Sequence, residues 1–145
     1  MWDDPMTQTR IYVPLLPEAV RRLAADREIG PAPVAAFGVT ERIERADPTG
    51  VEEEWEYAAL TEAADAAALL QGTTVAKRVV AAADVDPGTV SSDGTRESLA
   101  AVTVSSPIPL RQVVSFHVDE EAGDQGMEDL LWYDATELDE VLRLL

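Results

Sequence analysis

Three short runs of β-forming residues fill the second half of the chain, and each is bounded by residues that form turns. The runs are residues 77–85 (KRVVAAADV), 98–104 (SLAAVTV) and 111–118 (RQVVSFHV). The breakers between them are DPG at 86–88, DG at 93–94 and SPIP at 106–109. Because consecutive strands usually lie beside one another in a sheet, this pattern predicts an antiparallel meander.

The first half of the chain combines strand and helix patterns. Residues 10–13 (RIYV) and 33–40 (PVAAFGVT) alternate as half-buried strands do. Between these two runs, Pro17 suits the first turn of a helix, and Gly30-Pro31 supplies a stop signal. A strand–helix–strand start of this length allows a parallel, right-handed crossover.

Two further helices are predicted before the β-rich half. A short one ends near Pro48, and a long one covers residues 49–71, where Thr49 and Glu52 match a capping box. The long helix carries a narrow stripe of mostly small residues, which allows it to lie close to a sheet or to another helix. The stripe consists of Tyr57, Leu60, Ala64 and Ala67.

The C-terminal residues predict a last strand and a last helix. Residues 130–133 (LLWY) are compatible with a strand, and Asp134 with Glu137 forms a second capping pattern. Apolar residues then recur at helical spacing, so this helix packs by one face. They are Leu138, Val141, Leu142 and Leu145.

Together these patterns predict a single α+β domain over residues 10–145, preceded by a flexible tail at residues 1–9. The expected order is β-α-β-α-α-β-β-β-(β)-α, with a mixed or mainly antiparallel sheet of about 5–6 strands covered by about 4 helices. A chain of 145 residues with 46% apolar residues can bury a core of its own.

Composition excludes several chemistries. The chain has no cysteine, which removes disulfides, thiol nucleophiles and iron–sulfur clusters and fits a reducing cytoplasm. Its first residues are acidic, where a signal peptide would be basic, and no apolar run approaches the ~20 residues needed to span a bilayer. We therefore expect a cytoplasmic protein that does not contact a membrane.

The chain is strongly acidic, with 28 Asp and Glu against 11 Lys and Arg and a formal net charge of −17. Nucleic acid is an unsuitable partner, because phosphates are neutralised by clustered bases. From Asp119 to Glu140 there are ten carboxylates and no base. The simpler interpretation, which we favour, is that this segment keeps the protein soluble, with part of the acidity set by a GC-rich genome. The alternative is a surface that mimics nucleic acid or binds a basic partner.

The only histidine lies in the run at 111–118. Alternation along this strand places His117 opposite the apolar side chains and beside Asp119, if the strand extends one residue further. The predicted apolar face consists of Val114, Phe116 and Val118, and the other of Arg111, Val113, Ser115 and His117.

The pair of His117 and Asp119 has two interpretations. With an arginine such as Arg10 or Arg111, the pair suits general acid–base chemistry in a small hydrolase or transferase. The simpler interpretation, which we favour, is a partly exposed histidine at the end of a strand. Either way, the neighbouring carboxylates predict a pKa of His117 above ~6.5.

Other catalytic and cofactor signals are missing, and no catalytic residue, metal ligand or cofactor is assigned. A zinc site needs more His or Cys ligands than one histidine. Two acidic stretches, 84–97 and 119–130, resemble calcium loops but lack the turn glycine and the final glutamate. The sequence contains no G-x-S-x-G, G-x-x-x-x-G-K or G-x-G-x-x-G motif.

Large aromatic residues complete the candidate binding surface. Aromatic side chains are enriched at interfaces, although in a small domain they more often belong to the core. Trp55 is a further aromatic residue that could join such a surface. The candidate surface consists of Tyr12, Arg111, His117, Asp119, Trp132 and Tyr133.

Several stretches resemble an uncharacterised family of short acidic proteins from high-GC actinobacteria, a domain of unknown function. They are RIYVPLLPEAVRRL, EEEWEYAAL, RVVAAADV and LLWYDATELDEVL, and the resemblance runs from Arg10 to the C-terminus. It implies a cytoplasmic bacterial protein without established activity and transfers no catalytic residue.

Three hypotheses on function follow. The favoured one is a non-catalytic interaction module for a protein with a basic surface or for a small ligand. The alternatives are the small hydrolase or transferase at His117 and Asp119, and a carboxylate site for a divalent ion such as Mg²⁺ or Ca²⁺. The partner, the oligomeric state and the strand order are left open by the sequence.

Overall fold

A computed structural model describes residues 7–145 and shows an α+β domain built on an antiparallel sheet. Of the flexible tail expected at residues 1–9, residues 1–6 lie outside the described residues, and Thr9 already belongs to the first strand. The helices are α1 (Pro17–Asp26), α2 (Glu41–Ala46), α3 (Glu52–Leu70) and α4 (Leu138–Leu144). The strands are β1 (Thr9–Leu15), β2 (Glu28–Ile29), β3 (Val34–Gly38), β4 (Val79–Val85), β5 (Val90–Ser92), β6 (Ala101–Val104), β7 (Ile108–Pro109), β8 (Val113–Asp119) and β9 (Leu130–Asp134).

Seven strands form the main sheet in the order β5-β6-β3-β1-β4-β8-β9, and β2 pairs with β7 in a separate two-stranded sheet. The expected α+β class, the mainly antiparallel sheet and the four α-helices are confirmed for residues 7–145. The number of strands was underestimated, because β2, β5 and β7 have only two or three residues each. Such short strands carry no readable alternation.

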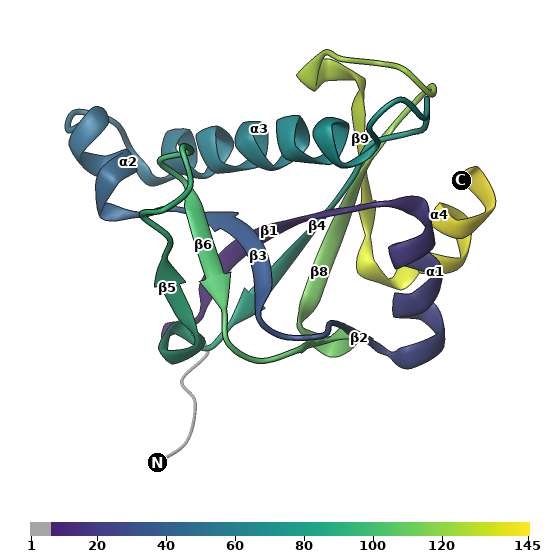
Figure 1. Cartoon of the computed structure of the whole chain (residues 1–145), viewed down its shortest axis with the longest axis horizontal. Coiled ribbons are helices and arrows are strands. Elements are labelled where there is room, and N and C mark those ends of the chain that lie inside the picture. The colour runs from purple at the N-terminus through teal and green to yellow at the C-terminus, as the bar shows by residue number, and fades with distance from the viewer. Residues whose placement is uncertain (1–6) are drawn as a thin grey trace.

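Helices cover both faces of the main sheet, so its central strands are buried on both sides. Figure 1 shows α3 lying along one face, while α1 and α4 lie side by side against the other. Alternate residues of β1 and β4 enter two separate cores. Strand β4 (VVAAADV) therefore reads as an almost continuous apolar run rather than an alternating one.

Helix α3 approaches the sheet closely because its buried face consists of alanines. They are Ala59, Ala63, Ala64 and Ala67, and each is at most 1% exposed. The predicted close approach fits this geometry, but the stripe was partly wrong, because Tyr57 is 56% exposed. The helix also begins later than predicted. The Glu54 carboxylate accepts a hydrogen bond from the Val51 N–H at 3.0 Å, and Thr49 lies before the cap.

The parallel crossover that the sequence allowed is not formed in residues 7–145, and the predicted meander was wrong. Strands β1 and β3 are antiparallel neighbours, with Tyr12 opposite Phe37, rather than the ends of a parallel crossover. After α1 the chain first forms β2 outside the main sheet and then turns, so it enters β3 from the opposite end. The predicted meander is also absent from residues 7–145, because β3 and β1 lie between β6 and β4.

Strand β8 contains an irregularity that changes which residues face each core. Ala82 pairs with Ser115 and Ala83 pairs with Val113, so Val114 is an extra residue. Val113 thus joins Phe116 and Val118 on the α1 and α4 face, while Val114 packs on the α3 face. The predicted apolar face was therefore wrong at Val114, and an inserted residue of this kind leaves no signal in the alternation.

Local predictions at the helix ends were more accurate. Pro17 begins α1 as predicted, but α1 ends at Asp26, because Arg27 adopts a left-handed conformation with φ of 63°. Before α4, the Asp134 carboxylate accepts from the Thr136 N–H at 2.9 Å, and Glu137 accepts from the Asp134 N–H at 3.0 Å. Among residues 7–145, no helix combines the length and the apolar character that crossing a bilayer requires.

Candidate interaction surface

Strand β9 is one edge of the main sheet, and it exposes large apolar side chains. Trp132 is 61% exposed and Leu131 is 39% exposed. Edge strands are usually protected by shortness, lysine, proline or a bulge. The opposite edge, β5, has three residues with exposed Ser91 and Ser92, whereas β9 (LLWYD) carries neither lysine nor proline. Strand β9 is therefore the less protected edge.

The register of β8 and β9 shows which backbone groups of β9 face outward. The Glu120 N–H donates to the Asp129 carbonyl at 3.0 Å, just before the first paired residues, Asp119 and Leu130. Hydrogen-bonded and non-hydrogen-bonded pairs alternate in an antiparallel ladder. Leu131 and Tyr133 therefore bond to β8, while the N–H and C=O of Trp132 point away from the sheet.

His117 lies directly opposite Trp132 on β8, with Val80 of β4 on its other side. Its side chain is half-buried. Burial lowers the pKa of His117 below its ordinary value of 6.5, and the positive charge of Arg10 lowers it further. The sequence-based expectation of a raised pKa was wrong, because burial and Arg10 dominate and the Asp119 carboxylate is engaged by Arg78.

A titration of this single histidine tests the placement. We expect the midpoint of the His117 imidazole signals, followed by NMR, to lie below about 6.5. Because the unfolded chain then binds the proton more readily, this group should lower stability as the pH falls through and below that value. A midpoint at or above the ordinary value would contradict the half-buried position beside Trp132.

Asp119 forms a buried ion pair with Arg78 at the start of β4. Arg78 Nη2 lies 2.8 Å from Asp119 Oδ1, and Arg78 Nε lies 3.0 Å from Asp119 Oδ2. The Arg78 side chain is 3% exposed and the Asp119 side chain 0%. The Arg78 backbone N–H also donates to Asp119 Oδ2 at 2.7 Å. Both carboxylate oxygens are thus engaged by Arg78, and Asp119 belongs to the scaffold.

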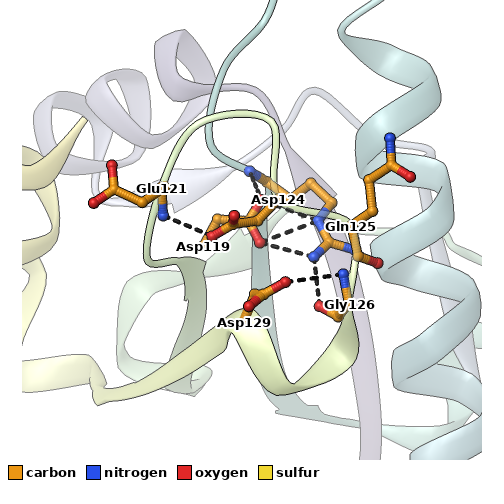
Figure 2. A network of polar contacts seen from close by, with 7 residues as sticks. Asp119, Glu121, Asp124, Gln125, Gly126 and Asp129 are labelled. Atoms are coloured by element: carbon orange, nitrogen blue, oxygen red, sulfur yellow. Dashed lines mark hydrogen bonds and ion pairs between the residues drawn. The ribbon is translucent and has the colours of Figure 1, made fainter.

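The same arginine holds the acidic loop that leads to β9. Arg78 Nη1 donates to the Gln125 carbonyl at 3.2 Å, and Nη2 donates to the Gly126 carbonyl at 2.8 Å. Figure 2 shows these contacts with two further bonds inside the loop. Asp124 accepts from the Glu121 N–H at 2.8 Å, and Asp129 accepts from the Gly126 N–H at 3.0 Å. These hydrogen bonds therefore define the conformation of the acidic loop before β9.

A second acidic region lies at the N-terminal end of α3. Arg10 pairs with Asp84 at 2.5 Å beside a polar hollow of about 440 Å³. The residues of this hollow are Gln8, Thr9, Arg10, Val39, Glu44, Glu52, Glu56 and Asp84.

Burial and the charge of Glu52 raise the pKa of Glu56. Burial, followed by the charge of Glu56, raises the pKa of Tyr12 to about 12. Tyr12 is buried and does not contribute to an exposed surface.

The remaining predicted residues lie toward the opposite face. Arg111 is exposed and lines a hollow of about 400 Å³ with Arg27, Thr136 and Asp139. Tyr133 packs against the core beneath α1 and α4. The structure therefore brings together only His117 and Trp132 among the predicted residues.

Sequence reasoning missed Arg78, because its partner lies 41 residues away and no spacing signal connects them.

Within residues 7–145, no group of three or more His, Asp or Glu side chains is placed to hold a metal ion.

Comparison with known families decides the classification. A model of a family of unknown function, DUF6912, matches residues 9–128, which is most of the chain. The chain belongs to DUF6912. This confirms the expected membership of a family without an assigned activity. No curated protein matches the chain, and no solved structure matches it.

The residues matched by the DUF6912 model include Arg78, His117 and Asp119, which lie next to β9 or hold the loop before it. Strand β9 and helix α4 follow the matched range. The residues that orient the β9 edge are therefore part of the DUF6912 domain, whereas Trp132 lies beyond the matched residues.

Proposed function

We propose that this protein is a non-catalytic interaction module that binds a basic protein segment on the surface around β9. This β9 surface consists of Leu131 and Trp132 with the flanking Glu128, Asp134 and Glu137. The observation that carries the proposal is Trp132, which is 61% exposed on the less protected edge strand of the main sheet. Exposed tryptophans surrounded by polar residues are typical anchors of protein interfaces.

The charge around β9 supports a basic partner. Of the ten carboxylates between Asp119 and Glu140, two form ion pairs within residues 7–145. Asp119 pairs with Arg78, and Glu140 pairs with Arg143 at 2.7 Å. The others give this end of the molecule a negative potential, which attracts and orients a positive partner. A cytoplasmic location, expected from the lack of cysteine, is part of the proposal.

The placement of the candidate catalytic residues favours binding over the hydrolase or transferase alternative. Asp119 is bound to Arg78, and Arg10 is paired with Asp84. Arg111 lines a hollow on the α1 and α4 side. His117 therefore lacks the free Asp119 carboxylate that the acid–base pair requires, although the charge of Arg10 still acts on the histidine.

A selection from random peptides displayed on phage tests this function. We expect the protein to select peptides with more Lys and Arg than the library, because the β9 surface is acidic and apolar. Trp132→Ala should lose this selection. Tyr57→Ala is the matched control, since Tyr57 is 56% exposed on α3 and outside the β9 surface.

Two results would contradict the proposed function. In the first, the selected peptides are no richer in Lys and Arg than the library. In the second, Trp132→Ala and Tyr57→Ala select the same peptides as the unaltered protein, which would show that the β9 surface is not involved.

A further inference from the structure

We infer that the basic partner binds as an extended segment that pairs with β9 and adds a strand to the main sheet. The inference rests on the proposed function and specifies its binding mode. Strand addition requires an open edge with free backbone donors and acceptors. In residues 7–145, β9 has a paired strand on one side only.

The free backbone groups of β9 are centred on Trp132. The register with β8 directs its N–H and C=O outward. The C=O of Leu130 shares this direction, while the outward N–H of Asp134 is occupied by Glu137. An incoming strand therefore forms its backbone bonds around Trp132, within a strand of five residues. So short a pairing needs side-chain contacts for specificity, and the exposed indole supplies one.

The acidic ends of β9 select a basic segment over a second copy of the chain. Two β9 strands paired antiparallel around Trp132 would bring Asp129 of one copy near Asp134 of the other, at both ends of the pairing. Each copy also has a formal net charge of −17. Like charges across strands destabilise a pairing, whereas opposite charges stabilise it. The occupant is therefore a segment with Lys or Arg at both ends.

The partner residue that pairs with Trp132 also needs a defined side-chain chemistry. Trp132 and His117 share the α3 face of the sheet, and the residue paired with Trp132 projects onto this same face. An arginine at that position can lie over the indole ring in a cation–π contact. The inferred partner is an extended segment with alternating arginine and aliphatic residues.

The test uses a blocked heptapeptide of alternating Arg and Val and two N-methylated forms of it. One form carries N-methyl groups on the valines and the other on the inner arginines. Successive N–H groups of a strand point to opposite edges. We expect one form to bind at least about tenfold more weakly than the parent peptide, and the other to bind within about threefold of it.

Two protein variants provide the matched comparison. Trp132→Ala removes the indole, and Trp132→Pro removes both the indole and the outward N–H. Proline is tolerated at an edge strand where its missing N–H faces outward. Trp132→Pro should therefore keep the circular dichroism spectrum of Trp132→Ala and bind the peptide at least about threefold more weakly, measured by calorimetry.

The outcomes separate the binding mode from the proposed function. If both N-methylated peptides bind alike, or if the two Trp132 variants bind alike, strand addition is wrong. The proposed function survives that result when the parent peptide still prefers the unaltered protein to Trp132→Ala. If the parent peptide shows no such preference at low salt, both proposals fail. A peptide-free dimer that Trp132→Pro dissociates would make a second copy the occupant and overturn the inference.

Discussion

Asp119→Ala should lower the free energy of unfolding by about 3–5 kcal/mol, because it leaves the buried guanidinium of Arg78 without its counter-charge. Arg78 is 3% exposed and has no second carboxylate within ion-pair distance in residues 7–145. The substitution also removes the acceptor for the Arg78 backbone N–H. Urea denaturation of the two proteins measures the difference.

Asp84→Ala is the matched control for this prediction. Asp84 also pairs with an arginine across the sheet, but Arg10 is 37% exposed and Asp84 29% exposed. Pairs open to solvent contribute about 0–1 kcal/mol, so this variant should remain close to the unaltered protein. Equal losses for the two variants would show that burial does not distinguish the pairs. The acidic loop should also become a site of proteolysis in Asp119→Ala alone, because Arg78 then holds it less firmly.

Ala63→Leu should lower the free energy of unfolding by about 1–3 kcal/mol, because the larger side chain must push α3 away from the sheet. Ala63 is 0% exposed and belongs to the core shared with Tyr12, Val80 and Ala82. Packed interiors contain no void into which three additional carbon atoms fit. Thermal or urea denaturation provides the measurement.

Tyr57→Ala is the comparison for the helix face. Helical spacing alone placed Tyr57 in the buried stripe, whereas the structure exposes it. Exposed substitutions usually change stability by no more than about 0.5 kcal/mol. If Tyr57→Ala destabilises the protein more than Ala63→Leu, the orientation of α3 described above is wrong.

Features encoded by neighbouring residues were predictable from the sequence. Pro17 marks the start of α1, because its fixed φ suits the first turn. Asp134 and Glu137 mark the start of the last helical segment through a reciprocal cap. Strand β9 was recognisable from LLWY between an acidic loop and this cap.

Features that depend on distant residues were not predictable. In the main sheet, β1 and β3 lie between β4 and β6, although β4 and β6 both come from the β-rich second half of the chain. The Arg78–Asp119 pair joins residues 41 positions apart. This pair also explains the error at His117, since strand alternation places Asp119 beside the histidine but does not reveal where the carboxylate points.

The positions of the residues proposed for the candidate surface were predictable only in part for the same reason. Trp132 and His117 lie together in the structure, because they are opposite residues of neighbouring strands. Tyr12 is buried beneath α3, and Tyr133 contributes to the core on the other face. Which aromatic residue is exposed depends on what covers each strand, and short motifs do not contain this information.

The most direct test of the proposed interaction is an NMR titration of the ¹⁵N-labelled protein with the Arg–Val heptapeptide. We expect the largest shift changes at the amides of residues 128–134, the indole N–H of Trp132 and the His117 ring. The hollow at Glu52 and Glu56 is an internal control, because it is acidic but lacks an exposed aromatic residue. Changes centred on that hollow, or spread evenly over the carboxylates, would contradict binding at β9.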